Sequence, residues 1–418
     1  MGNGKQLRIS LLSTYFENVG DDLVRAGVQR QLQLALGGDP TWLHTSKSNG
    51  LSLFSPLSRF SHTPLARMNS TIRAIAVSLE NRLNESSAFT FLNKALNTDL
   101  FVIAGTPLFY FVGADNFLNA EANFGSNWPE TVFSKRLEPV GAPPFIALGV
   151  GSIYEGTAVD LLKAHPNAAN FLNRFLRKAV LVSTRDDRTY NLLKLACPER
   201  ENILVKSVCP SLWAESEAVP KPMGLKVLIS YSAESSNWDL TRSKREVLDR
   251  RRLALDWVLQ YFHERGFEIV IAAHNKLDSQ VQHALNLEKR ARLIALRSAA
   301  DLTRAVGEAS LTITWRIHGA MAALAAGRPA VLFRTDARSP MAENLGALSV
   351  DDRCLLREDL ETVLDQACHR AALNEPWGLE NLERIKGLEL NKICSILTST
   401  LVTDRVYRLS SKHQIRTF

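Results

Sequence analysis

An arginine and a histidine separated by one residue follow an apolar, strand-like segment. Arg316 and His318 lie in SLTITWRIHGAMAALAAGRPAVLF (310–333), where strand residues end at Trp315 and small helix-forming residues follow Gly319. A guanidinium binds phosphate or carboxylate through paired hydrogen bonds, and imidazole transfers protons near neutral pH. Residues i and i+2 of an extended segment point to the same side. The pair predicts anion binding with acid/base chemistry; the alternative is an arginine paired to a core carboxylate and a histidine bonded to a backbone carbonyl.

A second arginine has the same position relative to its own strand. In AVLVSTRDDRTYNLLKLA (179–196), a strand pattern ends at Thr184 and Arg185 follows it. Asp186 is expected to cap the next helix or to fix a neighbouring guanidinium. Two arginines that face one cleft would suit a small substrate with two anionic groups.

A third strand-to-helix junction carries an asparagine, a glycine and an aspartate. In STYFENVGDDLVRAGVQRQLQLAL (13–36), Asn18, Gly20 and Asp21 precede a predicted helix that ends at Gly37. Gly20 permits an unusual backbone angle near a ligand. Asp21 is expected to cap the helix, with contact to a sugar hydroxyl or action as a base as the alternatives.

Other strand ends supply the remaining candidates. The segments 101–111 and 147–156 place Gly105 and Gly151 at strand ends, where a close approach to the backbone is allowed. His274 and Asp278 follow another strand end and are candidate cleft residues, with a surface histidine as the alternative for His274. The sequence contains no HExxH, GxSxG, EF-hand or zinc-spaced cluster, and its five cysteines are far apart. Metal, serine-esterase and disulfide chemistry are therefore not predicted.

Short runs rich in Val, Ile and Leu alternate with amphipathic stretches, as expected of parallel strands covered by helices. A break with Pro220, Pro222 and Gly224 divides them and predicts two α/β domains, 1–219 and 220–418. Both are expected to be Rossmann-like, with parallel sheets facing a ligand-binding cleft. The predicted strands are 7–14, 99–106, 143–151, 179–184, 202–208, 225–232, 267–274, 291–298, 310–315 and 329–335.

Two segments depart from this alternation. Residues 45–98 are rich in Ser, Asn and Arg and are expected to be an insertion on the first domain, partly helical from about 70 to 97. It is either a mobile acceptor-binding flap or a packed insertion. The tail from Thr403 carries four basic residues. Such clusters are usually solvated faces, and docking to a membrane or polymer is the alternative.

Composition indicates a water-soluble globular chain. Of its 418 residues, 45% are hydrophobic and 22% charged, and the formal net charge is +7. The diffuse basic excess is compatible with anionic small molecules, acidic polymers or a membrane surface, and does not predict nucleic-acid binding. No uninterrupted apolar run of about 18 residues and no signal-peptide pattern is present. We expect a cytoplasmic protein, with peripheral contact at the inner face of the membrane as the alternative.

Taken together, these segments resemble the polysaccharide pyruvyl transferase family. The matching elements are NVGDD with its helix, FVIAG, FIALGVGS, VSTRDDRTYNLL, AAHNKLD, and ITWRIHGAMAALAAGRPAVLF followed by DARSPMAENLG, over about residues 7–348. The resemblance implies a GT-B-like two-domain fold and transfer of the enolpyruvyl carbons of phosphoenolpyruvate to two sugar hydroxyls. The products are a cyclic ketal and phosphate, and no cofactor or metal is implied. By position, His318 is the family's acid/base residue, and Arg316 and Arg185 grip the donor.

The sequence departs from the family pattern at three places. Thr106-Pro107-Leu108 replaces a glycine run, Cys209-Pro210 replaces aspartate-proline, and Arg338 replaces a lysine. The expected acceptor is a sugar or lipid-linked oligosaccharide, in an exopolysaccharide or cell-surface glycan precursor. The alternatives are a GT-B-like glycosyltransferase that uses a nucleotide sugar, and a non-catalytic glycan-binding relative.

We assign acid/base chemistry to His318 and Asp21. Substrate binding is assigned to Arg185, Arg316, Asn18, Gly20, Gly105, Gly151, His274 and Arg338.

Overall fold

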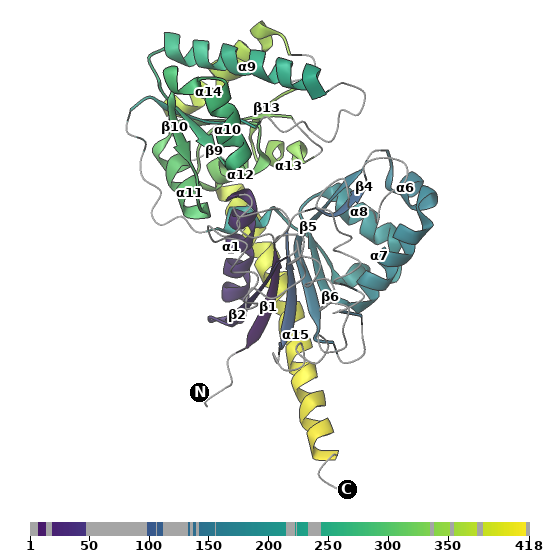
Figure 1. Cartoon of the computed structure of the whole chain (residues 1–418). Helices are drawn as coiled ribbons and strands as arrows, with labels where there is room; N and C mark the ends of the chain where they lie inside the picture. Colours follow the sequence, from purple (N-terminus) through teal and green to yellow (C-terminus); the bar gives the residue numbers. More distant parts are fainter. Residues whose placement is uncertain are drawn as a thin grey trace, which may run out of the picture. The chain divides into compact units, whose positions relative to one another are not determined.

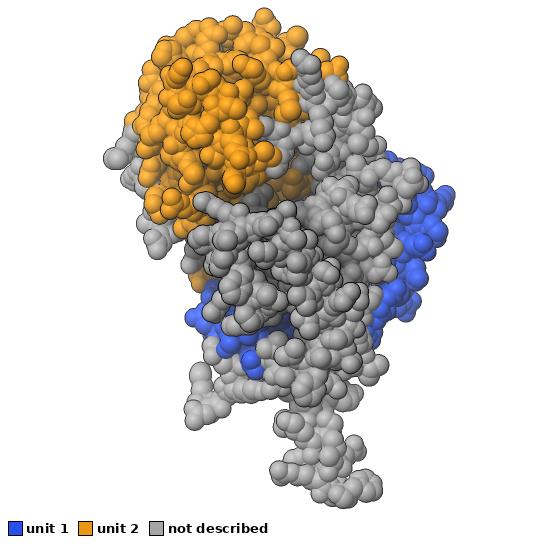
Figure 2. Space-filling model, viewed as in Figure 1, with its two compact units in different colours: residues 1–14, 31–207, 387–418 blue, residues 15–30, 208–386 orange. Residues whose placement is uncertain are grey.

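The chain divides into two compact units that are discontinuous in sequence (Figure 2). Unit 1 comprises Met1–Thr14, Gln31–Ser207 and Gly387–Phe418, and unit 2 comprises Tyr15–Arg30 and Val208–Lys386. The computed structural model describes residues 7–13, 19–46, 98–105, 107–111, 133, 137–138, 142–154, 156–214, 222, 224–232, 244–334, 338–351, 355–373 and 379–414.

Unit 1 is built on a parallel sheet in the order β2-β1-β3-β5-β6-β7, and β4 pairs with β5 beside this path. Its helices α6 (Ala158–Ala164), α7 (Pro166–Lys178) and α8 (Asp187–Ala196) follow the strands as crossovers (Figure 1). The strands are β1 Arg8–Ser13, β2 Thr41–Ser46, β3 Leu100–Ala104, β4 Pro107–Phe111, β5 Phe145–Tyr154, β6 Ala179–Thr184 and β7 Leu204–Lys206.

The core of unit 1 explains why these segments form their elements. Every residue of β3 is buried, as expected of a central parallel strand with covered faces. Helix α7 buries Phe171 and Phe175, one turn apart, against Phe145 of β5 and Phe133. The four rings lie 5.0–6.2 Å apart between centroids, in tilted and edge-on contacts.

Unit 2 repeats the architecture with a second parallel sheet, in the order β10-β9-β8-β11-β12-β13. Its strands are β8 Lys226–Ser230, β9 Glu268–Ala273, β10 Arg292–Ala295, β11 Leu311–Thr314, β12 Ala330–Phe333 and β13 Leu348–Val350. Its helices are α9 Lys244–Glu264, α10 Lys276–Ala284, α11 Ala299–Glu308, α12 Ile317–Ala325, α13 Ser339–Glu343 and α14 Arg357–Leu373.

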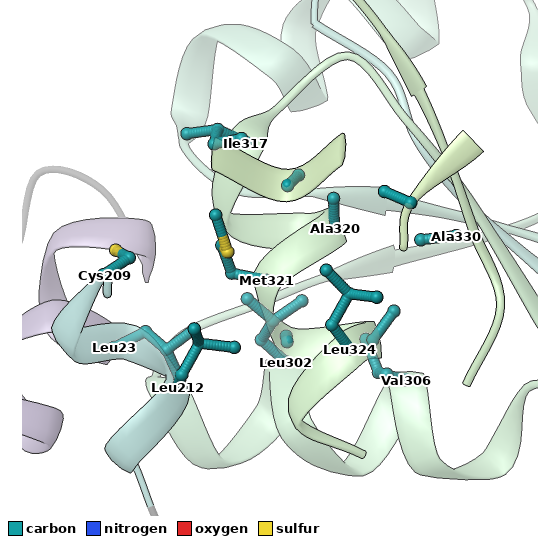
Figure 3. Packing of buried hydrophobic residues seen from close by; sticks show 14 of the residues in the cluster. Leu23, Cys209, Leu212, Leu302, Val306, Ile317, Ala320, Met321, Leu324 and Ala330 are labelled. Carbon is teal, nitrogen blue, oxygen red and sulfur yellow. The ribbon is translucent and has the colours of Figure 1, made fainter. Parts of the chain in front are cut away.

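Helix α12 lies inside unit 2, with eight of its nine residues buried. Figure 3 shows Met321 and Leu324 of α12 beside Leu302 of α11, with Leu23 of α1 (Val19–Leu36) and Cys209 in the same cluster. Small alanines on α12 allow this close packing. Cys209, one of the departures from the family pattern, is therefore an apolar core residue at 0% exposure.

The first two thirds of α1, Val19–Arg30, belong to unit 2 because they pack there. A Cβ placed on Gly27 would lie 1.7 Å from the carbonyl oxygen of Pro210, so the two backbones are in contact. Pro210 begins the short 3-10 helix η5 (Pro210–Trp213). Helix α1 passes from unit 2 to unit 1 between Arg30 and Gln31.

The C-terminal helix α15 (Leu379–Gln414) crosses between the units as well, and from Gly387 it belongs to unit 1. Buried Glu389 accepts a hydrogen bond from Nε2 of Gln31 at 3.0 Å and one from the hydroxyl of Ser207. Lys392 donates to the carbonyl of Leu204 at 3.0 Å. The sequence placed this tail with the second domain, whereas these contacts attach it to the first.

All ten predicted strands are present, with ends shifted by at most three residues. The predicted boundary at 219–220 differs from the observed division, in which the chain changes unit after Thr14, Arg30, Ser207 and Lys386. The predicted insertion at 45–98 lies outside the described residues, except for the end of β2 and residue 98 at its margin. The side chains of the basic tail lie outside them too.

Candidate functional site

Polar side chains of unit 2 gather where three neighbouring strands end. Ser230 is the last residue of β8, His274 directly follows β9, and Arg316 follows β11 by two residues. Because β9, β8 and β11 are parallel neighbours, their carboxyl ends lie at one edge of the sheet. That edge is where open α/β sheets bind ligands.

Arg316 is held by a buried carboxylate from α10. Its Nη2 donates to Oδ1 of Asp278 at 2.7 Å, and its Nε donates to Oδ2 at 3.1 Å. Arg316 thus has the carboxylate partner that was the alternative to ligand binding. The two hydrogen bonds hold the Nε–Nη2 side of the guanidinium against Asp278 and so fix the plane of the group.

His274 is buried, and the alternative of a surface histidine is wrong. Its Nε2 and the hydroxyl of Ser230 are 2.6 Å apart, and its backbone N–H donates to Oδ2 of Asp278 at 3.0 Å. The backbone N–H of Val19, at the start of α1, contacts the carbonyl of His274 at 3.5 Å. Burial, aided by the positive charge of Arg316, lowers the pKa of His274 to about 3. His274 is therefore a neutral imidazole at physiological pH.

His318 is the second residue of α12, and its ring lies against the backbone of Gly20. A Cβ on Gly20 would be 2.1 Å from Nδ1 of His318. The sequence attributed this glycine to an unusual backbone angle, which is wrong, because Gly20 is not among the residues with positive φ. It lacks a side chain because the imidazole occupies that space.

Helix α1 begins at Val19, so Gly20 and Asp21 lie in its first turn rather than before it. Asp21 is therefore not the N-cap. An acidic residue in the first turn still stabilises the helix through the macrodipole. The predicted candidate Asn18 lies outside the described residues.

The turn that carries Arg316 and His318 is fixed by a threonine. Thr314 Oγ1 accepts from the backbone N–H of Arg316 at 2.9 Å and donates to its carbonyl at 2.8 Å. A Cβ on Gly319 would be 2.6 Å from Thr314 Oγ1, so glycine is required there by packing. The end of β11 and the start of α12 are thereby held together, which fixes the backbone that carries His318.

Arg185 has the corresponding position in unit 1. It directly follows β6, and its side chain is buried over Gly151 of β5, where an added Cβ would lie 2.5 Å from Nε. The close approach predicted at Gly151 is thus made by the guanidinium of Arg185. Asp186 caps α8, since its Oδ1 accepts from the N–H of Thr189 at 2.6 Å, which confirms that prediction.

The remaining candidates are placed as follows. Gly105 follows β3 with φ of +52°, a left-handed conformation that favours glycine, and donates to the carbonyl of Leu148 at 2.8 Å. Arg338 immediately precedes α13 in unit 2, and its carbonyl accepts from Met341 N at 3.0 Å.

The structure brings Gly20, His274, Arg316 and His318 together in unit 2, and Gly151 and Arg185 together in unit 1. Joint action of the two arginines on one ligand stays a prediction.

Two residues of this arrangement were not assigned roles from the sequence. Ser230 is 0% exposed and bonded to His274, and its only signal was its place at the end of an apolar strand. Asp278 was noted near the cleft, but its pairing with Arg316 joins residues 38 positions apart.

Clusters of three or more potential metal ligands are absent from the part of the chain that the structure describes. Within the same residues, no helix combines the length and hydropathy needed to cross a bilayer.

Solved structures show the same fold at low sequence identity. The UDP-N-acetylglucosamine 2-epimerase of Rickettsia bellii has a TM-score of 0.54 at 14% identity, covering 96% of this chain and 98% of its own. The corresponding epimerase of Methanocaldococcus jannaschii has a TM-score of 0.51 at 14% identity, covering 94% and 100%. These likenesses confirm the GT-B-like fold expected from the sequence and show the fold alone.

No curated protein matches the sequence. The profile of the polysaccharide pyruvyl transferase family matches residues 18–337. This match spans the first turn of α1, both arginine-bearing strand ends and the start of α12. The chain therefore belongs to the polysaccharide pyruvyl transferase family, whose members are transferases of glycan biosynthesis.

Proposed function

We propose that this protein transfers the pyruvyl group of phosphoenolpyruvate onto two neighbouring hydroxyls of a sugar in a glycan precursor. The products are a cyclic pyruvate ketal and phosphate. Family membership supports pyruvyl transfer. The observation that carries the proposal is Arg316, fixed by Asp278 at a strand end and two residues before a packed histidine in the next helix.

The donor suits these groups because it carries both a phosphate and a carboxylate. Arg316 would bind one of these anions, next to the backbone N–H groups in the first turn of α12. Arg185 would receive the second anion, and Arg338 would add a further positive charge near the start of α13. Neutral His274 contributes hydrogen bonding without charge repulsion toward Arg316.

His318 is the proton-transfer group of the proposed reaction. Protonation of C3 of the enol makes C2 electrophilic, and the first sugar hydroxyl adds there and loses its proton. The bond from C2 to the phosphate oxygen then breaks, and the phosphate leaves with one of the released protons. The second hydroxyl closes the ring at C2. Asp21, in the first turn of α1, is the candidate for accepting a hydroxyl proton.

The acceptor is proposed to be a sugar or lipid-linked oligosaccharide of an exopolysaccharide or cell-surface glycan. A cytoplasmic setting with peripheral contact to the membrane would give access to a lipid-linked acceptor. Phosphoenolpyruvate serves as substrate, and the proposed chemistry uses no cofactor.

A thermal-shift titration tests the donor. Phosphoenolpyruvate at 100 times its Kd should stabilise the folded protein by about 2.7 kcal/mol. Stabilisation by a nucleotide sugar and none by phosphoenolpyruvate would replace the proposal with glycosyl transfer. Binding of phosphoenolpyruvate without phosphate release across glycan acceptors would instead indicate a non-catalytic relative.

His318→Ala tests the proton-transfer role. Loss of a positioned acid/base group should lower kcat by about 10²- to 10⁴-fold, while the phosphoenolpyruvate-induced thermal shift is retained. Phosphate release and the methyl NMR signal of the ketal are the measurements. Near-normal turnover by this variant would exclude His318 from the chemistry.

A further inference from the structure

Asp278 is a buried carboxylate with three hydrogen-bond donors around it. Its side chain is only 1% exposed. Oδ2 accepts from the backbone N–H of His274 at 3.0 Å and from Arg316 Nε at 3.1 Å, while Oδ1 accepts from Arg316 Nη2 at 2.7 Å. Charge-assisted bonds of this kind are about twice as strong as neutral ones.

Helix capping explains only one of these contacts. Asp278 is the third residue of α10, its N–H donates to the N-cap Asn275 at 2.8 Å, and its carboxylate reaches back to the N–H of His274. Asp301 makes the same arrangement at the start of α11. There Ser298 caps Asp301 N at 3.2 Å, and Oδ2 of Asp301 accepts from Arg297 N at 3.0 Å.

The two aspartates differ in what lies beyond the cap. The side chain of Asp301 is 31% exposed, and its ion pair is with Arg304 of the same helix at 3.7 Å. Asp278 instead binds Arg316, which follows a different strand, through two hydrogen bonds, one to each carboxylate oxygen. Its burial and its distant partner are therefore not required for starting a helix.

The pair also has an energetic consequence for ligand binding. An arginine side chain loses rotamer entropy when it is immobilised. Asp278 restricts the guanidinium before any ligand arrives, so less entropy is lost on binding. Because the charges of the pair cancel, Asp278 contributes orientation to the site rather than net positive charge.

We propose that Asp278 is a positioning residue, which sets the plane of the Arg316 guanidinium for contact with an anionic group of the donor. This inference rests on the proposed function for the identity of the donor. The positioning itself is a property of the protein without ligand and can be measured separately.

Asp278→Asn is the principal variant, and Asp301→Asn is its matched control. A misplacement of about 1 Å can cost about 10²-fold in rate. We therefore expect kcat/KM for phosphoenolpyruvate to fall about 10²-fold in Asp278→Asn and less than about 3-fold in Asp301→Asn. Equal losses in the two variants would overturn the proposal, because they would reduce Asp278 to a helix cap.

A double-mutant cycle separates positioning from general structural support. If Asp278 acts through Arg316, the double variant Asp278→Asn with Arg316→Lys should lose no more kcat/KM than Arg316→Lys alone. Losses that multiply would show that Asp278 acts independently of Arg316, and would refute the inference.

The ligand-free readout is hydrogen exchange at Nε of Arg316, followed by NMR and assigned by its disappearance in Arg316→Lys. We expect at least ten-fold faster exchange in Asp278→Asn and no change in Asp301→Asn. If this result holds while wild-type protein fails to use phosphoenolpyruvate, the proposed function falls and the positioning stands. Unchanged exchange in Asp278→Asn refutes the positioning whatever the activity.

Removing one partner of a buried ion pair is strongly destabilising, so Asp278→Asn can fail to fold. Asp278→Glu then serves as the second variant, because it keeps the charge and moves the carboxylate by one methylene. A folded Asp278→Glu protein should show faster Nε exchange and reduced kcat/KM. Wild-type values of both would contradict the inference.

Discussion

Gly20→Ala is a one-methyl change that tests whether His318 must lie where the structure places it. The added Cβ would be 2.1 Å from Nδ1, 2.8 Å from Cγ and 3.0 Å from Cβ of His318. Ordinary van der Waals contact begins at 3.4 Å, so the imidazole and the helix must separate by about 1.3 Å. His318 is confined by the turn at Thr314, so it cannot move by that amount and keep its present orientation.

The expected loss of activity follows from this displacement. A shift of about 1 Å in a reacting group costs about 10²-fold in rate, so kcat of Gly20→Ala should fall about 10²-fold. The free energy of unfolding of Gly20→Ala should change little, because two effects oppose each other. Overpacking costs about 1–3 kcal/mol, and alanine in place of glycine within a helix returns about 1 kcal/mol. Phosphate release gives kcat, and urea unfolding gives the free energy of unfolding.

Two glycines of the same region provide matched controls. Gly27→Ala introduces a Cβ 1.7 Å from the backbone of Pro210, so it should destabilise α1 strongly without contacting His318. Gly38→Ala meets no atom within 4 Å and should change neither quantity. Wild-type kcat in Gly20→Ala would refute the role of His318 as placed here. A kcat loss no larger than that of Gly27→Ala would show that the effect is only structural.

Two further predictions concern the buried polar groups. Because the pKa of His274 is about 3 when folded against a reference of 6.5, the unfolded state binds more protons between these values, and stability should fall as pH drops below 6.5. Between pH 7.5 and pH 5, His274 should lower the free energy of unfolding by about 2 kcal/mol. Urea unfolding of His274→Gln should lack this part of the pH dependence. The same pH dependence in His274→Gln and in the wild-type protein would show that His274 is not buried as a neutral base. In unit 1, Gly151→Ala would place a Cβ 2.5 Å from Arg185 Nε. Gly151→Ala should raise the Kd for phosphoenolpyruvate, measured by calorimetry, at least ten-fold, and the control Gly38→Ala should leave it unchanged. Equal Kd values for Gly151→Ala and the wild-type protein would remove Arg185 from the donor site.

Most strands that the sequence predicted are buried on both faces, and continuous Val, Ile and Leu runs identify them. The predicted strand β10 differs, because its four residues are half-buried or exposed. The strands it missed have weaker patterns. β13 has three residues, β2 reads TWLHTS, and β4 begins with a proline and pairs beside the main path of its sheet. The predicted boundary at the Pro- and Gly-rich stretch lies near one of the observed changes of unit, the one after Ser207. The crossings inside α1 and α15 leave no mark in composition, because a helix continues through them.

The candidate site was predictable where position in an α/β unit decides it. Arg185 and Arg316 follow β6 and β11 at their carboxyl ends, as the strand patterns indicated. The contacts of Gly20 with His318, of Gly151 with Arg185 and of Asp278 with Arg316 were not predictable. Each joins residues from different elements, and local periodicity contains no information about such pairs.

The interleaved order of the two units bears on how the chain is made. During synthesis the segment Val19–Arg30 emerges early, yet its packing partners on α12 and around Cys209 come roughly two to three hundred residues later. Unit 1 likewise receives its last piece, from Gly387, only after all of unit 2 has left the ribosome. Unit 1 can therefore be completed only after unit 2 has been synthesised, and unit 2 only after the whole of Gln31–Ser207 has emerged. Expressing the two halves separately, cut at the proline-rich stretch, should yield two insoluble fragments that each lack a helix supplied by the other.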